Sequence, residues 1–140
     1  MNAIMFVMIA ALAAGLYSVL QRIAAPGIDQ ALGALVIALV AAAISFAVLM
    51  ATRDHRSFEF APSIIALVAL TGVAAFSVDY FSLQAYSRGL SLSVGSPIFI
   101  GMSIATASLA GFFIGESVTL TKLLGIGLVV VGAVVLTVFG

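Results

Sequence analysis

The sequence predicts an all-α membrane protein, a bundle of five transmembrane helices. Of its 140 residues, 64% are apolar and only 7% are charged, whereas a soluble domain carries about 25% charged residues. A chain of this length cannot bury so much apolar surface in a core of its own. Charged residues, prolines and glycines divide the chain into apolar segments of about 20 residues, the length that spans a bilayer as a helix.

Each predicted helix is bounded by polar or helix-breaking residues. The five spans are residues 3–20, 31–51, 62–86, 92–114 and 123–139, in a single membrane domain over residues 1–140. Asp29 is expected to cap the second span, Pro62 to open the third, and either Thr119 or Thr121 to cap the fifth. A secretory signal is the rival interpretation of the first span, but only Met1 and Asn2 precede it, so it has no basic region.

Basic residues are nearly balanced between the two sides of the predicted membrane protein. Arg53, Arg56 and Lys122 lie on the side of the N-terminus, and Arg22 and Arg88 lie on the other. The positive-inside rule then favours a cytoplasmic N-terminus by one residue. Two topologies stay open, a fixed one with the N-terminus inside and insertion in both orientations. Zero net charge and the lack of a basic patch exclude a nucleic-acid partner.

Asp79 is the one ionisable residue well inside a predicted span. It lies seven residues before Tyr86, or about 10 Å from the helix end. A carboxylate at the centre of a membrane helix costs about 2.5–3.5 kcal/mol, so it should face protein or water. Its own helix offers no nearby cation, because Arg88 lies nine residues further along. One interpretation is a site for a substrate or a coupling ion; the other is a structural carboxylate held by Ser77 and Ser82.

Other polar and aromatic residues could complete such a site. The predicted substrate-binding or coupling residues are Asp79, Tyr80, Tyr86, Tyr17 and Ser96. For the tyrosines near span ends, an interfacial aromatic belt is the alternative explanation. Ser96 precedes Pro97, which removes a backbone donor inside the fourth span. That proline could either open the helix beside a cavity or only set its entry angle.

Small residues at four-residue spacing form a ridge on the fourth span, made of Ala107, Gly111 and Gly115. Such ridges let membrane helices approach closely, and close packing is what lipid cannot replace. We expect this ridge to make a dimer contact. Packing inside one subunit, or a contact through the fifth span around Gly132, are the alternatives.

An enzyme is not expected. The single histidine, His55, lies in a charged loop, and the chain contains no cysteine, so neither a metal cluster nor a cysteine nucleophile can be built. No glycine-rich phosphate loop occurs in the sequence. We therefore expect no metal and no cofactor.

The second half of the chain carries a series of short motifs in a fixed order. They are Tyr-x-x-Gly-Leu at 86–90, Pro97, the pair Gly115 and Glu116, Leu-Leu-Gly-Ile at 123–126, and Val-Gly-Ala-Val around Gly132. From about Phe81 to the end, the sequence resembles the second part of an EamA-like domain of the drug/metabolite transporter superfamily. The first half matches in span number and length. The resemblance implies one five-helix repeat, one half of an inverted-repeat transporter.

A single repeat implies a dimer or a partner of the same kind. The related small multidrug resistance proteins are four-helix antiparallel dimers with a glutamate in the first helix, whereas the first span here has no acidic residue. We expect a secondary transporter of a small metabolite or amphipathic compound, working as a homodimer that is antiparallel if the chain inserts both ways. Its partners would be the substrate and membrane lipid, in the inner (plasma) membrane of a bacterium. The alternative is a non-transporting accessory or scaffold subunit.

Overall fold

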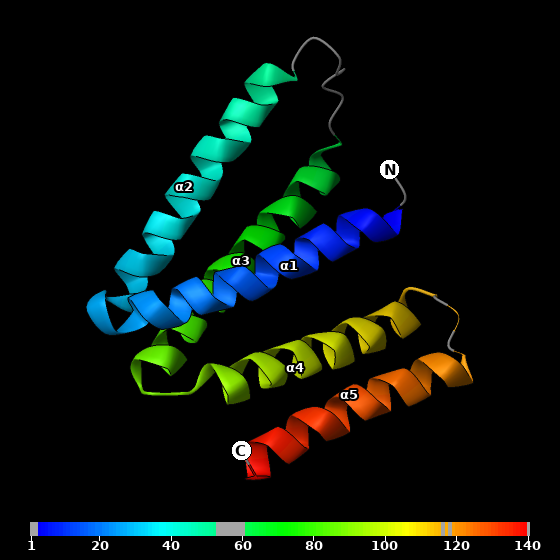
Figure 1. Cartoon of the computed structure of the whole chain (residues 1–140). Helices are drawn as coiled ribbons and strands as arrows, with labels where there is room; N and C mark the ends of the chain where they lie inside the picture. Colours follow the sequence, from blue (N-terminus) through cyan, green and yellow to red (C-terminus); the bar gives the residue numbers. More distant parts are fainter. Residues whose placement is uncertain (1–2, 53–60, 116, 118, 140) are drawn as a thin grey trace. The chain divides into compact units, whose positions relative to one another are not determined.

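The computed structural model describes residues 3–52, 61–115, 117 and 119–139, and these residues form helices and no strand (Figure 1). The helices are α1 (Ala3–Ala24), the short 3-10 turn η1 (Ala25–Gly27), α2 (Gln30–Ala51), α3 (Pro62–Ser87), α4 (Leu92–Phe113) and α5 (Leu120–Phe139). The five α-helices are long and apolar enough to cross a membrane. The prediction of an all-α membrane protein with five spans is therefore confirmed.

The helix starts follow the predicted capping residues, and α5 begins at Leu120, three residues before the predicted start at Leu123. Asp29 accepts hydrogen bonds from the backbone amides of Ala31 and Leu32, both at 3.0 Å. Thr119 accepts one from the amide of Lys122 at 3.3 Å, so it is Thr119 that caps α5. These side chains satisfy amides that have no partner within the first turn of a helix. Pro62 occupies the start of α3, as expected.

The end of α1 was predicted four residues too early. The helix continues through Gln21 and Arg22 and ends at Ala24. Glutamine and arginine are good helix formers, so their polarity does not end a helix. Pro26, in the η1 turn, does so because it lacks a backbone donor. The predicted loop of Arg53, Asp54, His55 and Arg56 lies outside the described residues, as does Glu116.

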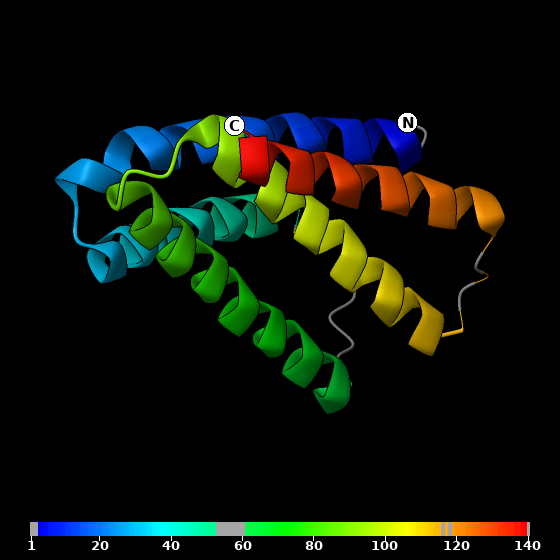
Figure 2. The same ribbon diagram turned by 90° about the horizontal axis from the view of Figure 1, so that it is seen from below.

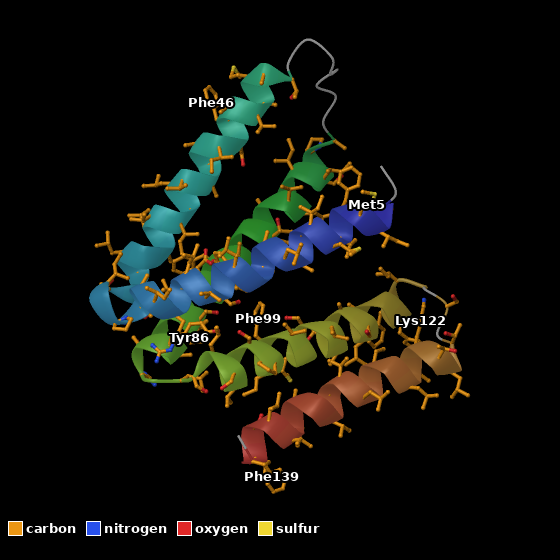
Figure 3. The ribbon with its side chains drawn as sticks, viewed as in Figure 1. Met5, Phe46, Tyr86, Phe99, Lys122 and Phe139 are labelled. Carbon is orange, nitrogen blue, oxygen red and sulfur yellow. The ribbon has the colours of Figure 1, made fainter. Side chains whose placement is uncertain are left out.

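Most apolar side chains point away from the protein (Figure 3). Phe46 is 62% exposed and Phe139 is 83% exposed. Among the described residues, the buried apolar side chains are Ala25, Ala34, Leu83 and Tyr86. Such an exterior would make a soluble protein aggregate, whereas lipid tails solvate it. The side-chain exposure is thus what a membrane protein requires.

The chain divides into two compact units, one of Leu20–Arg88 and one of Met1–Val19 with Gly89–Gly140. In the first unit, α2 and α3 run antiparallel and contact each other, and η1 contacts α3. They approach closely at Gly33, where an added Cβ would lie 2.7 Å from Cδ1 of the buried Leu83. A glycine at this position therefore allows the two backbones to come together.

In the second unit, α4 and α5 form an antiparallel hairpin (Figure 2). α4 continues through Pro97 without a break. At Gly101, near the middle of α4, an added Cβ would lie 2.9 Å from Cβ of Ala133, so the two helices approach closely there. Gly115 follows the end of α4 with φ of +89°, a left-handed conformation that favours glycine and commonly ends a helix.

Candidate functional site

The most polar buried contact joins α1 to α3. The side chain of Asp79 is 7% exposed and that of Gln21 is 5% exposed. Gln21 Nε2 donates a hydrogen bond of 3.3 Å to Asp79 Oδ1, across 58 residues of sequence. Both residues belong to the compact unit Leu20–Arg88. The last turn of α1 thus provides a donor for the carboxylate within α3.

An amide donor does not neutralise a carboxylate. Hydrogen bonds from cationic groups to carboxylates are typically about 2.7–2.9 Å long and much stronger than neutral ones. Within the described part of the chain, the bond from Gln21 is the polar contact of Asp79, and no cation pairs with it. An ionised Asp79 would therefore keep an uncompensated charge inside a membrane helix. That arrangement can accept a proton or a cationic group.

Aromatic and apolar side chains flank Asp79 along α3. Leu83 and Tyr86, one and two turns beyond Asp79, are 2% and 5% exposed. The half-buried Tyr80 stacks on Phe76, with ring centroids 5.8 Å apart. Tyr86 lies close to the end of α3 (Figure 3). Both members of the polar pair are buried, and burial strengthens electrostatic interactions.

A second interhelical hydrogen bond ties the same end of this unit together. Gln30 Nε2, in the first turn of α2, donates to Ser87 Oγ at 3.3 Å, and Ser87 Oγ donates to the carbonyl of Gln84 at 2.9 Å. Hydrogen bonds between membrane helices contribute about 0.6–2 kcal/mol each. These bonds fix the end of α3, and with it the position of the helix that carries Asp79.

The predicted site residues are only partly brought together. Asp79, Tyr80 and Tyr86 share α3 in one compact unit, whereas Tyr17 and Ser96 belong to the other unit, where both are half-buried. Of the two serines expected to hold a structural Asp79, Ser77 does not do so, because its Oγ donates to a backbone carbonyl.

The acceptor of the Ser77 bond is the carbonyl of Val73, at 2.9 Å. The residue that does hold Asp79, Gln21, was visible in the sequence as part of a polar cluster with Tyr17 and Ser18, but nothing in the sequence connected that cluster to Asp79.

The three residues of the predicted dimer ridge differ in their surroundings. Gly111 is buried and lines a groove between α4 and α5, whereas Ala107 is exposed and lies outside that groove. Gly115 follows the end of α4 and so is not on its helical face. The helical part of the ridge therefore consists of Ala107 and Gly111.

Five long apolar helices and a buried carboxylate between two of them define an integral membrane protein. The model of the EamA-like transporter family matches residues 1–138. The chain belongs to this family, and the resemblance read from the second half extends over nearly the whole sequence. No curated protein and no solved structure matches the chain. Its function is accordingly of the membrane-transporter type.

Proposed function

We propose that the protein is a secondary transporter of a small metabolite or amphipathic compound and that it works as a dimer. Membership of a transporter family supports transport. The observation that carries the proposal is Asp79, a buried carboxylate in a membrane helix whose partner is a neutral amide. Ionisable residues within membrane spans commonly belong to substrate or proton pathways.

The proposed role of Asp79 is to bind the substrate or the coupling ion. Tyr80 and Tyr86 would contribute from the same helix. Tyr17 and Ser96 belong to the other compact unit and stay predictions from the sequence. A state with a bare carboxylate in the apolar interior costs about 2.5–3.5 kcal/mol, which lowers its population by about a hundredfold or more. The empty protein would thus reorient rarely, and a bound cation or proton would remove the barrier. The protein would therefore reorient mainly when a cation or proton is bound, which couples its movement to transport.

The proposed dimer rests on the repeat architecture of secondary transporters. Transporters of this kind are commonly built from two repeats, with the substrate site near the membrane midplane between them. The described residues form one set of five α-helices, and a second copy is the proposed source of the other repeat. An antiparallel homodimer would reproduce the inverted arrangement.

An accessory or scaffold subunit is the second candidate. The observation that favours it is the burial of both Gln21 and Asp79, because polar side chains also serve to hold membrane helices together. In that case the pair would stabilise the subunit and transport nothing.

A flux assay separates the two candidates. We expect the purified chain in liposomes to move at least one member of a panel of organic cations, zwitterions and neutral amphiphiles, and the same compound to raise its melting temperature in detergent. Protein-free liposomes give the background. A folded chain that neither binds nor moves any member of the panel, and that co-purifies with a larger membrane protein, would identify an accessory subunit instead.

Topology can be read with introduced thiols, because the chain has no cysteine. Gly27→Cys reports on the connection after α1, where an added Cβ meets nothing within 4 Å, and Ser57→Cys reports on the loop beyond α2. With a bias of one basic residue, each thiol is expected to be labelled from both faces of the membrane. Labelling from one face only would indicate a parallel dimer or a fixed heteromer.

The same thiols test whether the charge balance controls orientation. Removing Arg53 and Arg56 by substitution with Gln reverses the bias, so the labelling should shift toward the opposite orientation. His55→Gln, in the same loop, removes neither Lys nor Arg and should leave the labelling unchanged. An unchanged pattern in the double variant would show that these charges do not set the topology.

A further inference from the structure

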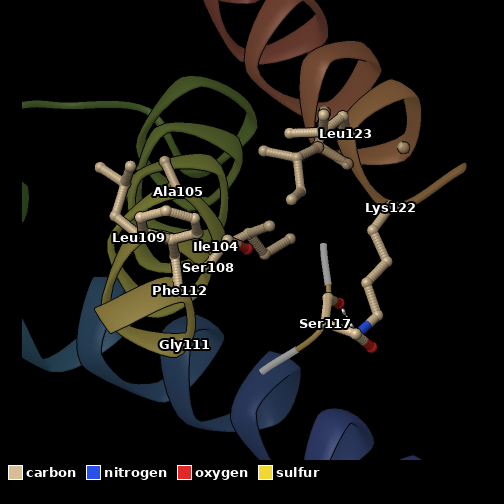
Figure 4. A pocket seen from close by; sticks show the side chains of 12 residues that line it. Ile104, Ala105, Ser108, Leu109, Gly111, Phe112, Ser117, Lys122 and Leu123 are labelled. Atoms are coloured by element: carbon tan, nitrogen blue, oxygen red, sulfur yellow. Dashed lines mark hydrogen bonds between the residues drawn. The ribbon is translucent and has the colours of Figure 1, made fainter. Parts of the chain in front are cut away.

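A groove of about 890 Å³ lies between α4 and α5, toward the connection that joins them (Figure 4). It lies wholly within the unit that contains the α4–α5 hairpin. Large apolar side chains make up most of its walls, among them Ile104, Leu109, Phe112, Leu123 and Ile126. Outside the groove the two helices approach closely at Gly101, where an added Cβ would lie 2.9 Å from Cβ of Ala133. The groove is thus a largely apolar recess along the part of the hairpin next to the connection.

Lys122 lines this groove at the end next to the connection between α4 and α5. Its Nζ donates a hydrogen bond of 2.9 Å to the backbone carbonyl of Ser117 (Figure 4). An ammonium group has three donors, so two N–H bonds remain for another acceptor. The other residues that line the groove carry no charge. The groove therefore combines apolar walls with one positive charge, at the end next to the connection.

The depth of the groove distinguishes between possible occupants. Its lining runs from Ile104 to Phe112 on α4 and from Lys122 to Val129 on α5, which corresponds to about 12 Å and 10 Å of helix. Half of the hydrocarbon core of a bilayer is about 15 Å thick. The groove thus spans less than the depth of one leaflet. A transmembrane helix of a second copy would extend over more than twice that depth, beyond the residues that line the groove.

We propose that this groove binds an anionic phospholipid, with an acyl chain between α4 and α5 and the phosphate at Lys122. The apolar side chains of the groove would contact the acyl chain in place of neighbouring lipid. The ammonium group of Lys122 would bind the negative headgroup. A lysine near the membrane surface strengthens the binding of an anionic lipid by about fivefold. The site is separate from Asp79 and does not depend on what the protein transports.

A tryptophan reporter tests the proposal, because the chain contains no tryptophan. Phe112→Trp places the reporter in the groove, and Phe113→Trp, at a residue that is 84% exposed and outside the lining, is its matched control. Vesicles of phosphatidylcholine with about 10% phosphatidylglycerol brominated on its acyl chains keep the anionic lipid sparse. We expect stronger quenching at position 112 than at 113.

The role of the charge is tested in the same vesicles. Lys122→Gln should weaken the preference for brominated phosphatidylglycerol about fivefold. Glu116→Gln, which removes the opposite charge from the same connection, should not weaken it. Native mass spectrometry of the chain without a reporter should likewise show phosphatidylglycerol retained by the wild type and lost from Lys122→Gln, so the test does not depend on the tryptophan variants folding.

Four outcomes would overturn the proposal. Equal quenching at positions 112 and 113 would mean that no lipid is held in the groove. Equal quenching by brominated phosphatidylcholine, unaffected by Lys122→Gln, would mean that the headgroup is not recognised. Displacement of the lipid by inorganic phosphate would indicate a site for small anions, and loss of quenching as the protein dimerises would place a second copy in the groove.

Discussion

Asp79→Asn is expected to reduce transport to the background of protein-free liposomes while the protein still folds and inserts. Asparagine has the shape of aspartate and keeps an oxygen that can accept the 3.3 Å bond from Gln21. It cannot carry the charge or take up a proton. The measurement is substrate flux into liposomes over a series of pH values, with the melting temperature as the check on folding.

Asp29→Asn is the matched control for this substitution. It also replaces one carboxylate by an amide, but at the start of α2, where Asp29 caps the helix. Asparagine caps a helix as well as aspartate does, so folding and transport should both be unchanged. Normal transport by Asp79→Asn at every pH would show that Asp79 is structural. Loss of transport in both variants would point to net charge and away from the position of Asp79.

Gly111→Leu is expected to convert the dimer to a monomer in mild detergent, and Gly132→Leu to do so less. A leucine at position 111 would push a neighbouring helix away from the ridge. At Gly132 an added Cβ meets nothing within 4 Å in the subunit, so that variant controls for adding the same side chain to α5. Molar mass from size-exclusion chromatography with light scattering measures the result.

Ala107→Leu separates the dimer contact from the groove. Gly111 lines the groove between α4 and α5, so a leucine there would fill it as well as alter the ridge. Ala107 is an exposed member of the ridge outside the groove. Its substitution should weaken the dimer and leave lipid quenching at position 112 intact. A larger loss of dimer in Gly132→Leu would move the contact to α5, and equal loss of folded protein would assign both glycines to packing within one subunit.

The helices could be predicted from the sequence because each depends on local chemistry. Apolar runs of membrane length, with Asp29, Pro62 and Thr119 at their starts, determine where helices form. The same reasoning misplaced the end of α1, since polar residues such as Gln21 do not stop a helix and Pro26 does. Asp79 could also be found from sequence, because a charge in an apolar run is conspicuous.

The partner of Asp79 could not be found in this way. Gln21 lies three residues from the end of α1 and Asp79 eight residues from the end of α3, or about 5 Å and 12 Å along the two helices. Counting along the helices therefore puts them at different depths. Only the way the end of α1 packs on α3 brings them to 3.3 Å. The groove was equally hidden, because it depends on the separation of α4 and α5.

The contact between Gln21 and Asp79 also has a consequence for how the protein is made. Gln21 is synthesised 58 residues before Asp79, so at typical rates it leads by about 3–12 s. The amide is the less costly of the two groups to place in a membrane, and it enters first. When the third helix arrives, its carboxylate meets a donor that is already at the end of α1. The order of the chain thus shortens the time during which Asp79 lies in lipid without a protein donor.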